Sequence, residues 1–125
     1  MGEVQSLIKP IQELERKRYP VKILQFGTGN FLRGFADWIF QVVNDKTGFN
    51  GGISVVQSIS TDNQLASQEG LYTVILKGFR EEEFVSNQYK IDVIQRVVNP
   101  VADFDAFLNE ALNPDLQFII SNTTE

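Results

Sequence analysis

The segment Val21–Phe35, which reads VKILQFGTGNFLRGF, constrains the fold of this chain more than any other stretch. It begins as a short apolar run that suits a buried strand, passes through Gly27 and Gly29, and ends in an amphipathic repeat. The two glycines allow a tight turn and a close approach of the backbone to a pyrophosphate. A helix that begins near Asn30 would direct its free N–H groups at that anion. The segment therefore predicts a dinucleotide-binding turn.

The glycine pattern departs from the usual G-x-G-x-x-G, because the third glycine position holds Leu32. Gly34 lies on the flank of the predicted helix, and we expect it to supply the close helix-to-sheet approach instead. A plain strand-to-helix turn is the alternative interpretation. The strand before the glycines and the helix after them favour the nucleotide-binding one.

A helix and a second strand follow the turn. Apolar residues recur at about 100° per residue, which indicates a helix: Phe31, Phe35, Trp38, Ile39 and Val42. The polar residues Arg33, Asp37, Gln41 and Asn44 are expected on the opposite side. A glycine-rich turn then leads into a strand within Ile53–Ile59. Strand, helix and strand of this length predict a parallel, right-handed βαβ unit.

The second half of the chain predicts a hairpin, a helix and another buried strand. Leu71–Lys77 and the extended stretch Phe84–Val98 flank a charged turn, whose Glu81–Glu83 run is interpreted as an exposed tip rather than a weak cation site. Asp103 is a suitable N-cap for a helix, and Leu116–Ile120 is the final strand. The fold class is therefore α/β: a Rossmann-like, partly parallel sheet with a β-hairpin insertion.

Composition excludes several functions. The chain has 125 residues, a formal net charge of -5, and neither cysteine nor histidine. Disulfides, cysteine zinc sites and histidine acid–base catalysis are therefore excluded, and no metal site is predicted. The negative charge argues against nucleic acid as a partner. No apolar run approaches the roughly 20 residues that span a bilayer, so we expect no membrane partner and a cytoplasmic location.

Ligands of a parallel sheet bind at the carboxyl ends of its strands. Three such ends are candidates here: Gly27–Arg33, Gln57–Asp62 and Ser121–Glu125. Gln57 stands where NAD sites often place an acid for the ribose hydroxyls, which leaves the choice between NAD and NADP open. Two partners are open for Arg33: Asp37 one helical turn further on, or a phosphate.

With these motifs in view, the chain resembles the N-terminal part of the sugar-acid oxidoreductases in the mannitol dehydrogenase family of polyol-specific long-chain dehydrogenases. The resemblance runs almost end to end, through ILQFGTGNFLRGF, the Asp37-Trp38 pair, GLYT at Gly70–Thr73 and SNTTE at Ser121–Glu125. It implies NAD as cofactor and a sugar acid as substrate, with interconversion of D-altronate and D-tagaturonate in hexuronate breakdown.

The resemblance also implies the cofactor-binding residues. They are one continuous stretch and two residues at other strand ends: Leu24, Gln25, Phe26, Gly27, Thr28, Gly29, Asn30, Phe31, Leu32 and Arg33, with Gln57 and Asn122. No catalytic residue is assigned, because the lysine base of the family lies in a helical C-terminal domain with which nothing here aligns. We therefore expect residues 1–125 to be the N-terminal part of a larger cofactor-binding domain, with residues 1–20 as an arm.

Two other functions remain open at this point. The chain could be a free-standing nucleotide-binding module without catalysis, which a gene ending at Glu125 would favour. It could also be a methyltransferase that uses S-adenosylmethionine, although such enzymes normally place acids where this chain has Gln25 and Gln57.

We predict that the 125-residue chain alone does not oxidise altronate, because the resemblance locates the proton acceptor outside it. Absorbance of NADH in the presence of NAD and D-altronate measures this. Turnover above that of a chain-free control would contradict the prediction.

Overall fold

The computed structural model describes residues 17–57, 68 and 70–122. Its main sheet has four parallel strands in the order β5-β2-β1-β6: β1 (Val21–Phe26), β2 (Gly52–Val56), β5 (Ile94–Val98) and β6 (Phe118–Ser121). The described part of the proposed 1–20 arm is residues 17–20, and the rest of it lies outside the described residues.

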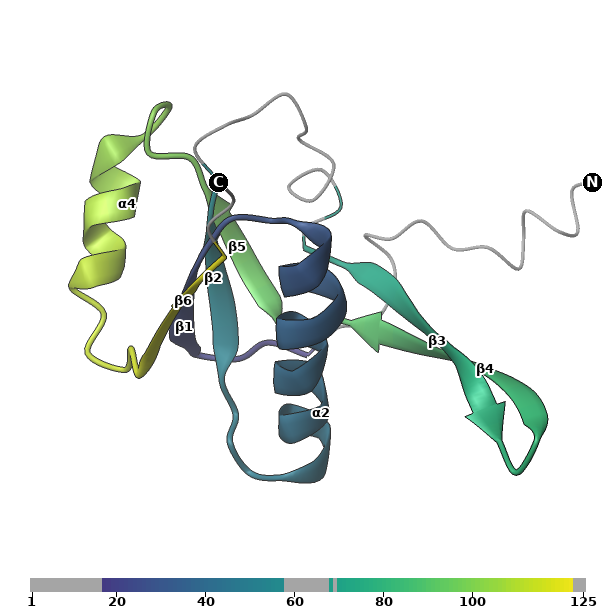
Figure 1. Cartoon of the computed structure of the whole chain (residues 1–125). Coiled ribbons are helices and arrows are strands. Elements are labelled where there is room, and N and C mark those ends of the chain that lie inside the picture. Colours follow the sequence, from purple (N-terminus) through teal and green to yellow (C-terminus); the bar gives the residue numbers. More distant parts are fainter. Residues whose placement is uncertain (1–16, 58–67, 69, 123–125) are drawn as a thin grey trace, which may run out of the picture.

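Helices lie on both sides of this sheet. The π-helical turn η2 (Leu32–Ala36) and helix α2 (Asp37–Lys46) connect β1 to β2. Helix α4 (Phe104–Ala111) connects β5 to β6 and lies on the opposite side from α2 (Figure 1). A parallel sheet between helices confirms the α/β, Rossmann-like fold class.

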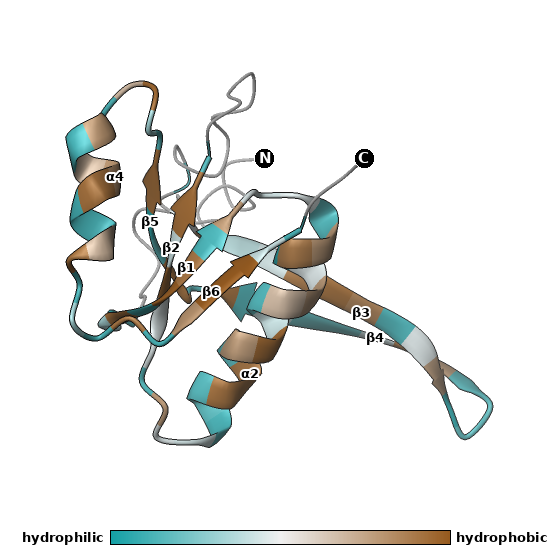
Figure 2. Cartoon of the chain, turned by 60° about the vertical axis from the view of Figure 1, so that its left-hand side comes forward, coloured by the Kyte–Doolittle hydropathy of each residue, from teal (hydrophilic) through white to brown (hydrophobic). Residues whose placement is uncertain are grey.

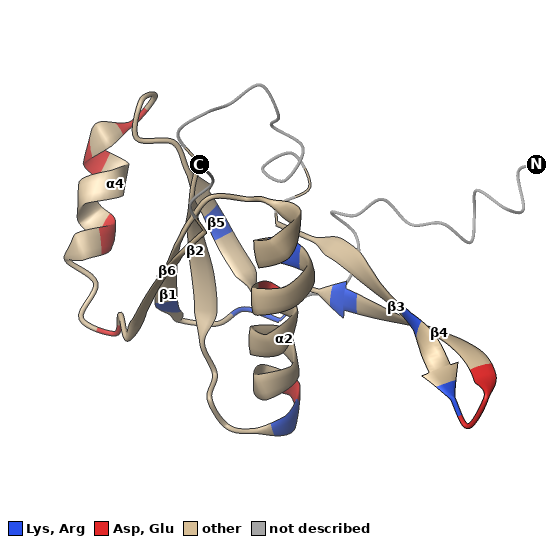
Figure 3. Ribbon diagram, viewed as in Figure 1, with Lys and Arg blue, Asp and Glu red and all other residues tan. Residues whose placement is uncertain are grey.

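A second sheet is the antiparallel hairpin of β3 (Tyr72–Arg80) and β4 (Glu83–Ile91), which projects away from the parallel sheet (Figure 1). Its tip is exposed and carries the predicted acidic run, with Glu81 and Glu82 at φ 53° and 69° (Figure 3). The hairpin insertion is therefore confirmed.

The extended stretch Phe84–Val98 contributes to two strands, β4 and β5, which belong to different sheets. It divides at Asp92, after which β5 joins the parallel sheet beside β2. Gln41 of α2 stabilises the break between β4 and β5, because its side-chain oxygen accepts hydrogen bonds from the backbone N–H groups of Asp92 at 2.9 Å and Val93 at 3.0 Å. Backbone groups at the bend are thus satisfied by a helix side chain instead of a strand partner.

The hydrophobic core lies where the two sheets meet. Its fully buried side chains come from β1, β2 and the junction of β4 with β5: Ile23, Ile53, Val55, Ile91, Val93 and Ile94. Figure 2 shows the corresponding apolar stretches in the central strands. Both faces of the parallel strands are covered there, which explains why their sequences are continuous apolar runs rather than alternating ones.

The predicted apolar and polar sides of the helical segment that contains η2 and α2 were wrong in part. Asp37 and Gln41, expected on the solvent side, are 0 % and 3 % exposed, whereas Phe31 and Phe35 are 57 % and 51 % exposed. The cause is hydrogen bonding: Gln41 satisfies the Asp92 bend and Asp37 contacts Tyr72 of the hairpin. Trp38 still packs against the core, with its ring edge-on to Tyr89.

The C-terminal elements follow the predicted order but not the predicted burial. Asp103 caps α4 by accepting a hydrogen bond from the backbone N–H of Ala106 at 3.0 Å, as expected. Arg96 of β5 holds the helix through a bidentate contact with Glu110 at 2.6 and 3.0 Å. Strand β6, predicted as buried, leaves Ile119 65 % exposed, because β6 lies at the sheet edge and pairs with β1 among the described strands.

Gly70 precedes the hairpin and lies in close contact with β5. Its φ is +80°, and a Cβ there would lie 2.7 Å from the carbonyl oxygen of Ile94. Both the backbone conformation and the contact with β5 therefore disfavour a larger residue.

We predict that Gly70→Ala lowers the free energy of unfolding by about 1–3 kcal/mol, because it strains the backbone and displaces β5. Urea denaturation measures the change. Gly78→Ala is the matched control, since a Cβ at Gly78 of the same hairpin would meet nothing within 4 Å. Equal stabilities of the two variants would contradict the prediction.

Candidate functional site

The glycine turn lies at the centre of the parallel sheet's carboxyl edge. β1 ends at Phe26 and lies between two parallel neighbours, and the chain reaches β2 on one side of β1 and β6 on the other. Such a reversal of strand order leaves a crevice at the strand ends, where open α/β sheets bind their ligands.

Gly27 makes the turn possible. Its φ is +105°, a conformation that side chains with a Cβ rarely adopt. Its N–H donates to the carbonyl oxygen of Val56 at 3.0 Å, which ties the turn to β2. The buried side chain of Gln25 donates from Nε2 to the carbonyl oxygen of Gly27 at 3.0 Å. Both backbone polar groups of Gly27 therefore have hydrogen-bond partners in the sheet, on β2 and β1.

Gly29 leaves space above the turn. A Cβ built on it would meet no atom of the described residues within 4 Å. The first backbone hydrogen bond of the helix runs from Arg33 N–H to the carbonyl oxygen of Gly29 at 3.0 Å. The N–H groups of residues 30–32 precede that bond, so they have no acceptor within the helix and favour an anion.

Leu32 replaces the usual third glycine by packing, and Gly34 does not take over that role. Leu32 is 3 % exposed, and its Cδ1 would lie 3.5 Å from a Cβ on Gly27. Gly34 is exposed, and a Cβ there would contact nothing within 4 Å. The close approach predicted at Gly34 was therefore wrong, because Gly34 lies on the exposed side of the π-helical turn.

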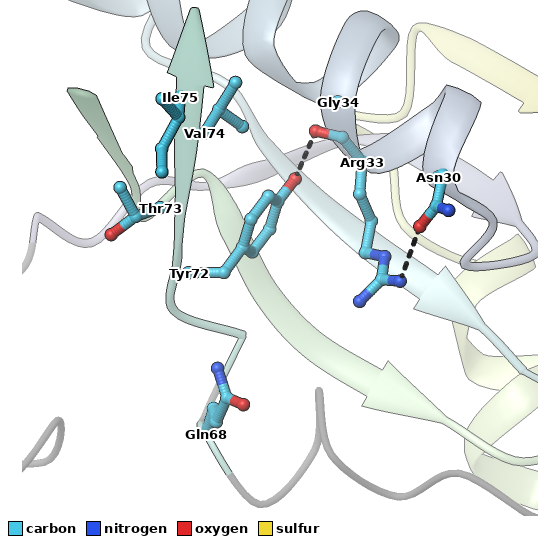
Figure 4. Close-up of a pocket in the computed structure, with 8 residues that line it drawn as sticks. All are labelled: Asn30, Arg33, Gly34, Gln68, Tyr72, Thr73, Val74 and Ile75. Carbon is cyan, nitrogen blue, oxygen red and sulfur yellow. Dashed lines mark hydrogen bonds between the residues drawn. The ribbon is translucent and has the colours of Figure 1, made fainter. Parts of the chain in front are cut away.

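A cavity of about 400 Å³ opens beside the start of the helix (Figure 4). Asn30, Arg33 and Gly34 line one side, and the hairpin strand β3 with Tyr72 lines the other. Arg33 Nη2 donates a hydrogen bond of 3.2 Å to Asn30 Oδ1, which holds the guanidinium at this cavity. Arg33 Nε is buried and has no partner among the residues that the structure describes. Arg96–Glu110 is the only salt bridge among the described residues, so Arg33 forms no salt bridge with Asp37.

Asp37 lies buried beneath the cavity. Burial raises its pKa to about 7, against the lowering effects of hydrogen bonds from Gln25 and Tyr72 and of the positive charge of Arg33. Burial, together with Asp37, also raises the pKa of the Tyr72 hydroxyl above its ordinary value. None of the described residues forms a hydrogen bond with Asp37 Oδ1. The site therefore contains a carboxyl group that exchanges a proton near neutral pH.

The structure brings most of the expected site residues together. Leu24 to Arg33 form the end of β1, the turn and the helix start, while Gln57 and Asn122 follow the ends of β2 and β6 at the same sheet edge. Leu24 and Gln25 lie buried below the turn, whereas Phe31 and Asn122 are exposed. Asp62 and the terminal residues 123–125 lie outside the described residues.

Sequence reasoning assigned no site role to Tyr72 and Asp37. The signals that single them out are the GLYT and Asp37-Trp38 motifs, which carried the resemblance but had no assigned chemistry. Across residues 17–57, 68 and 70–122 there is no group of three side chains suited to hold a metal ion. In the same part of the chain, no helix has the length and apolar character to cross a membrane.

Comparison with known protein families gives a match over residues 21–125 to the Rossmann domain of mannitol dehydrogenase. Altronate oxidoreductase of Klebsiella pneumoniae strain 342 is 49% identical over 111 residues, and that of Bacillus subtilis strain 168 is 46% identical over 110. Each alignment covers 86% of this chain and 23% of the relative. The chain thus spans about a quarter of the length of the curated relatives it matches.

Solved structures show the same fold at low sequence identity. The Pseudomonas fluorescens mannitol 2-dehydrogenase, in a ternary complex with NAD and D-mannitol, matches with a TM-score of 0.70 at 19% identity. The match covers 83% of this chain and 22% of that one. A D-sorbitol dehydrogenase in substrate-free form matches with a TM-score of 0.66 at 20% identity, over 85% of this chain and 23% of that one.

We predict that Asp37→Asn removes a pH dependence of stability. A carboxyl with a raised pKa in the folded state binds more protons there than in the unfolded state between about pH 4 and pH 7. The free energy of unfolding of the unchanged protein therefore falls as pH rises through this window, by about 3–4 kcal/mol from this group.

Urea denaturation at pH 5 and pH 8 measures the effect. We expect Asp37→Asn to gain stability relative to the unchanged protein at pH 8 but not at pH 5. Asp115→Asn, at an exposed carboxyl, is the matched control. Parallel stability curves for the unchanged protein and Asp37→Asn would contradict the prediction.

Proposed function

Because the chain belongs to the mannitol dehydrogenase family, we propose that it is the NAD-binding part of an oxidoreductase that interconverts D-altronate and D-tagaturonate. In this proposal residues 21–125 are the N-terminal part of the cofactor domain, and residues 1–20 are an arm before it. Its relatives named altronate oxidoreductase support the substrate, and the NAD complex of the mannitol 2-dehydrogenase supports the cofactor.

The observation that carries the proposal is the pair of glycines at the end of β1. Gly27 adopts a positive φ, and Gly29 has open space where a Cβ would lie. A backbone turn that is bare on its outer side and is followed by free helix N–H groups fits a pyrophosphate. The residues present therefore fit a dinucleotide.

Each proposed ligand residue has a distinct part. The turn Gly27–Gly29 and the helix start up to Leu32 offer backbone N–H groups, and Arg33 offers a guanidinium to a phosphate. Leu24, Gln25 and Phe26 support the turn from β1. Gln57 and Asn122 face the ribose and nicotinamide ends, since they follow the strands on either side of β1. When bound, NAD accepts or donates the hydride at the alcohol carbon of the substrate.

We predict that Gly29→Val prevents NADH binding, because the side chain occupies the space proposed for the pyrophosphate. The fold should tolerate the change, since a Cβ at Gly29 meets no other group within 4 Å in the part of the chain that the structure describes. A titration followed by NADH fluorescence measures the dissociation constant, and we expect an increase of at least tenfold.

Gly48→Val is the matched control, because Gly48 also has no neighbour within 4 Å of a Cβ but follows α2, away from the glycine turn. It should bind NADH as the unchanged protein does. Equal affinities of the Gly29 and Gly48 variants would mean that the turn is structural only.

A further inference from the structure

The Tyr72 hydroxyl joins the hairpin to the proposed cofactor site. It donates to the carbonyl oxygen of Arg33, within the π-helical turn, at 2.8 Å (Figure 4). This is a contact between residues 39 positions apart, and it crosses the cavity wall from β3 to η2. π-Helical turns are rare and often occur at functional sites.

The side chain of Arg33 has more N–H donors at this cavity than the described residues satisfy. One Nη2 contact goes to Asn30 Oδ1, and the buried Nε has no partner among the described residues. Figure 4 shows the guanidinium between Tyr72 and Asn30. A buried cationic donor without a partner is costly unless a ligand satisfies it, and a phosphate oxygen matches guanidinium geometry.

The proton of Tyr72 can serve only one acceptor at a time. A carbonyl oxygen cannot donate, so the 2.8 Å contact with Arg33 requires the Tyr72 proton. Asp37 Oδ2 lies 3.4 Å from the same hydroxyl. A protonated Asp37 donates a hydrogen bond to the Tyr72 oxygen, so the Tyr72 hydroxyl continues to donate to the carbonyl oxygen of Arg33. An ionised Asp37 can only accept, so it competes with that carbonyl oxygen for the Tyr72 proton.

We propose that Tyr72 is a positioning residue, a role that rests on the proposed dinucleotide function. Through its hydrogen bond to the carbonyl oxygen of Arg33, Tyr72 holds the guanidinium toward a phosphate of the dinucleotide. Protonated Asp37 maintains the contact between Tyr72 and Arg33. Tyr72 touches no phosphate itself in this arrangement. Its effect on cofactor affinity passes through Arg33.

The arrangement makes the affinity for the cofactor dependent on pH. The groups that face Asp37 are Arg33 from η2, Tyr72 from β3 and the uncharged Gln25 from β1. Ionisation of Asp37 draws both the Tyr72 proton and the Arg33 charge toward the carboxylate and away from the cavity. Because burial raises the pKa of Asp37 to about 7, the loss of affinity falls between about pH 6 and pH 8.

A double-mutant cycle on NADH binding tests the proposal at pH 6. Tyr72→Phe alone should weaken binding by about threefold to tenfold, the worth of one hydrogen bond. Arg33→Gln alone should weaken it by about tenfold or more. Tyr72→Phe added to Arg33→Gln should have no further effect, because Tyr72 acts through Arg33.

The same titration at pH 6, 7 and 8 tests the part of Asp37. The unchanged protein should lose about threefold to tenfold in affinity as pH rises, whereas Asp37→Asn should show no such loss. Tyr72→Phe should show a smaller loss than the unchanged protein, because ionised Asp37 still attracts the charge of Arg33 in that variant. Tyr89→Phe is the matched control: it removes a hydroxyl from the paired strand of the hairpin, and none of the described residues hydrogen-bonds that hydroxyl. It should behave as the unchanged protein.

The outcomes separate this proposal from the function on which it rests. If the unchanged chain does not bind NADH, both are overturned. If it binds NADH but the two substitutions weaken binding additively, or Tyr72→Phe has no effect, only the role of Tyr72 is overturned. If Tyr72→Phe does not fold, the pH series with Asp37→Asn decides, and an unchanged pH dependence in that variant overturns the proposal.

Discussion

The position of β1 between two parallel neighbours is the constraint on which the rest of the structure depends. Pairing with β2 and β6 uses the hydrogen-bonding groups along both edges of β1, so this strand occupies the middle of the sheet. The chain must then leave the sheet at Gly27, and the N–H of Gly27 still reaches back to Val56 of β2. The glycine turn is thus held from the sheet side and left open on the other.

The sequence predicted the features that depend on local chemistry. The apolar runs of β1 and β2, the glycine turn, the Asp103 cap and the hairpin tip each follow from a few adjacent residues, and the structure has all of them. The shared position of the proposed cofactor-site residues at one edge of the sheet was predictable for the same reason, because a parallel sheet brings the carboxyl ends of its strands to one edge.

The remaining features depend on contacts between distant residues. Helical periodicity placed Asp37 and Gln41 toward solvent, but partners on β3 and at the end of β4 draw both inward. The break at Asp92 has the same origin, since it needs the amide of Gln41, 51 positions away. No window of neighbouring residues contains either partner, so periodicity alone could not predict that Asp37 and Gln41 are buried.

The sheet order also has a consequence for how the chain assembles. The hairpin pairs residues close in sequence, whereas Ile23 of β1 lies opposite Phe118 of β6. Contacts between such distant residues form slowly, because the intervening chain must first be closed into a loop. During synthesis the second edge of β1 stays open until β6 leaves the ribosome. The hairpin can therefore form early, while the crevice beside the glycine turn is completed only when β6 arrives.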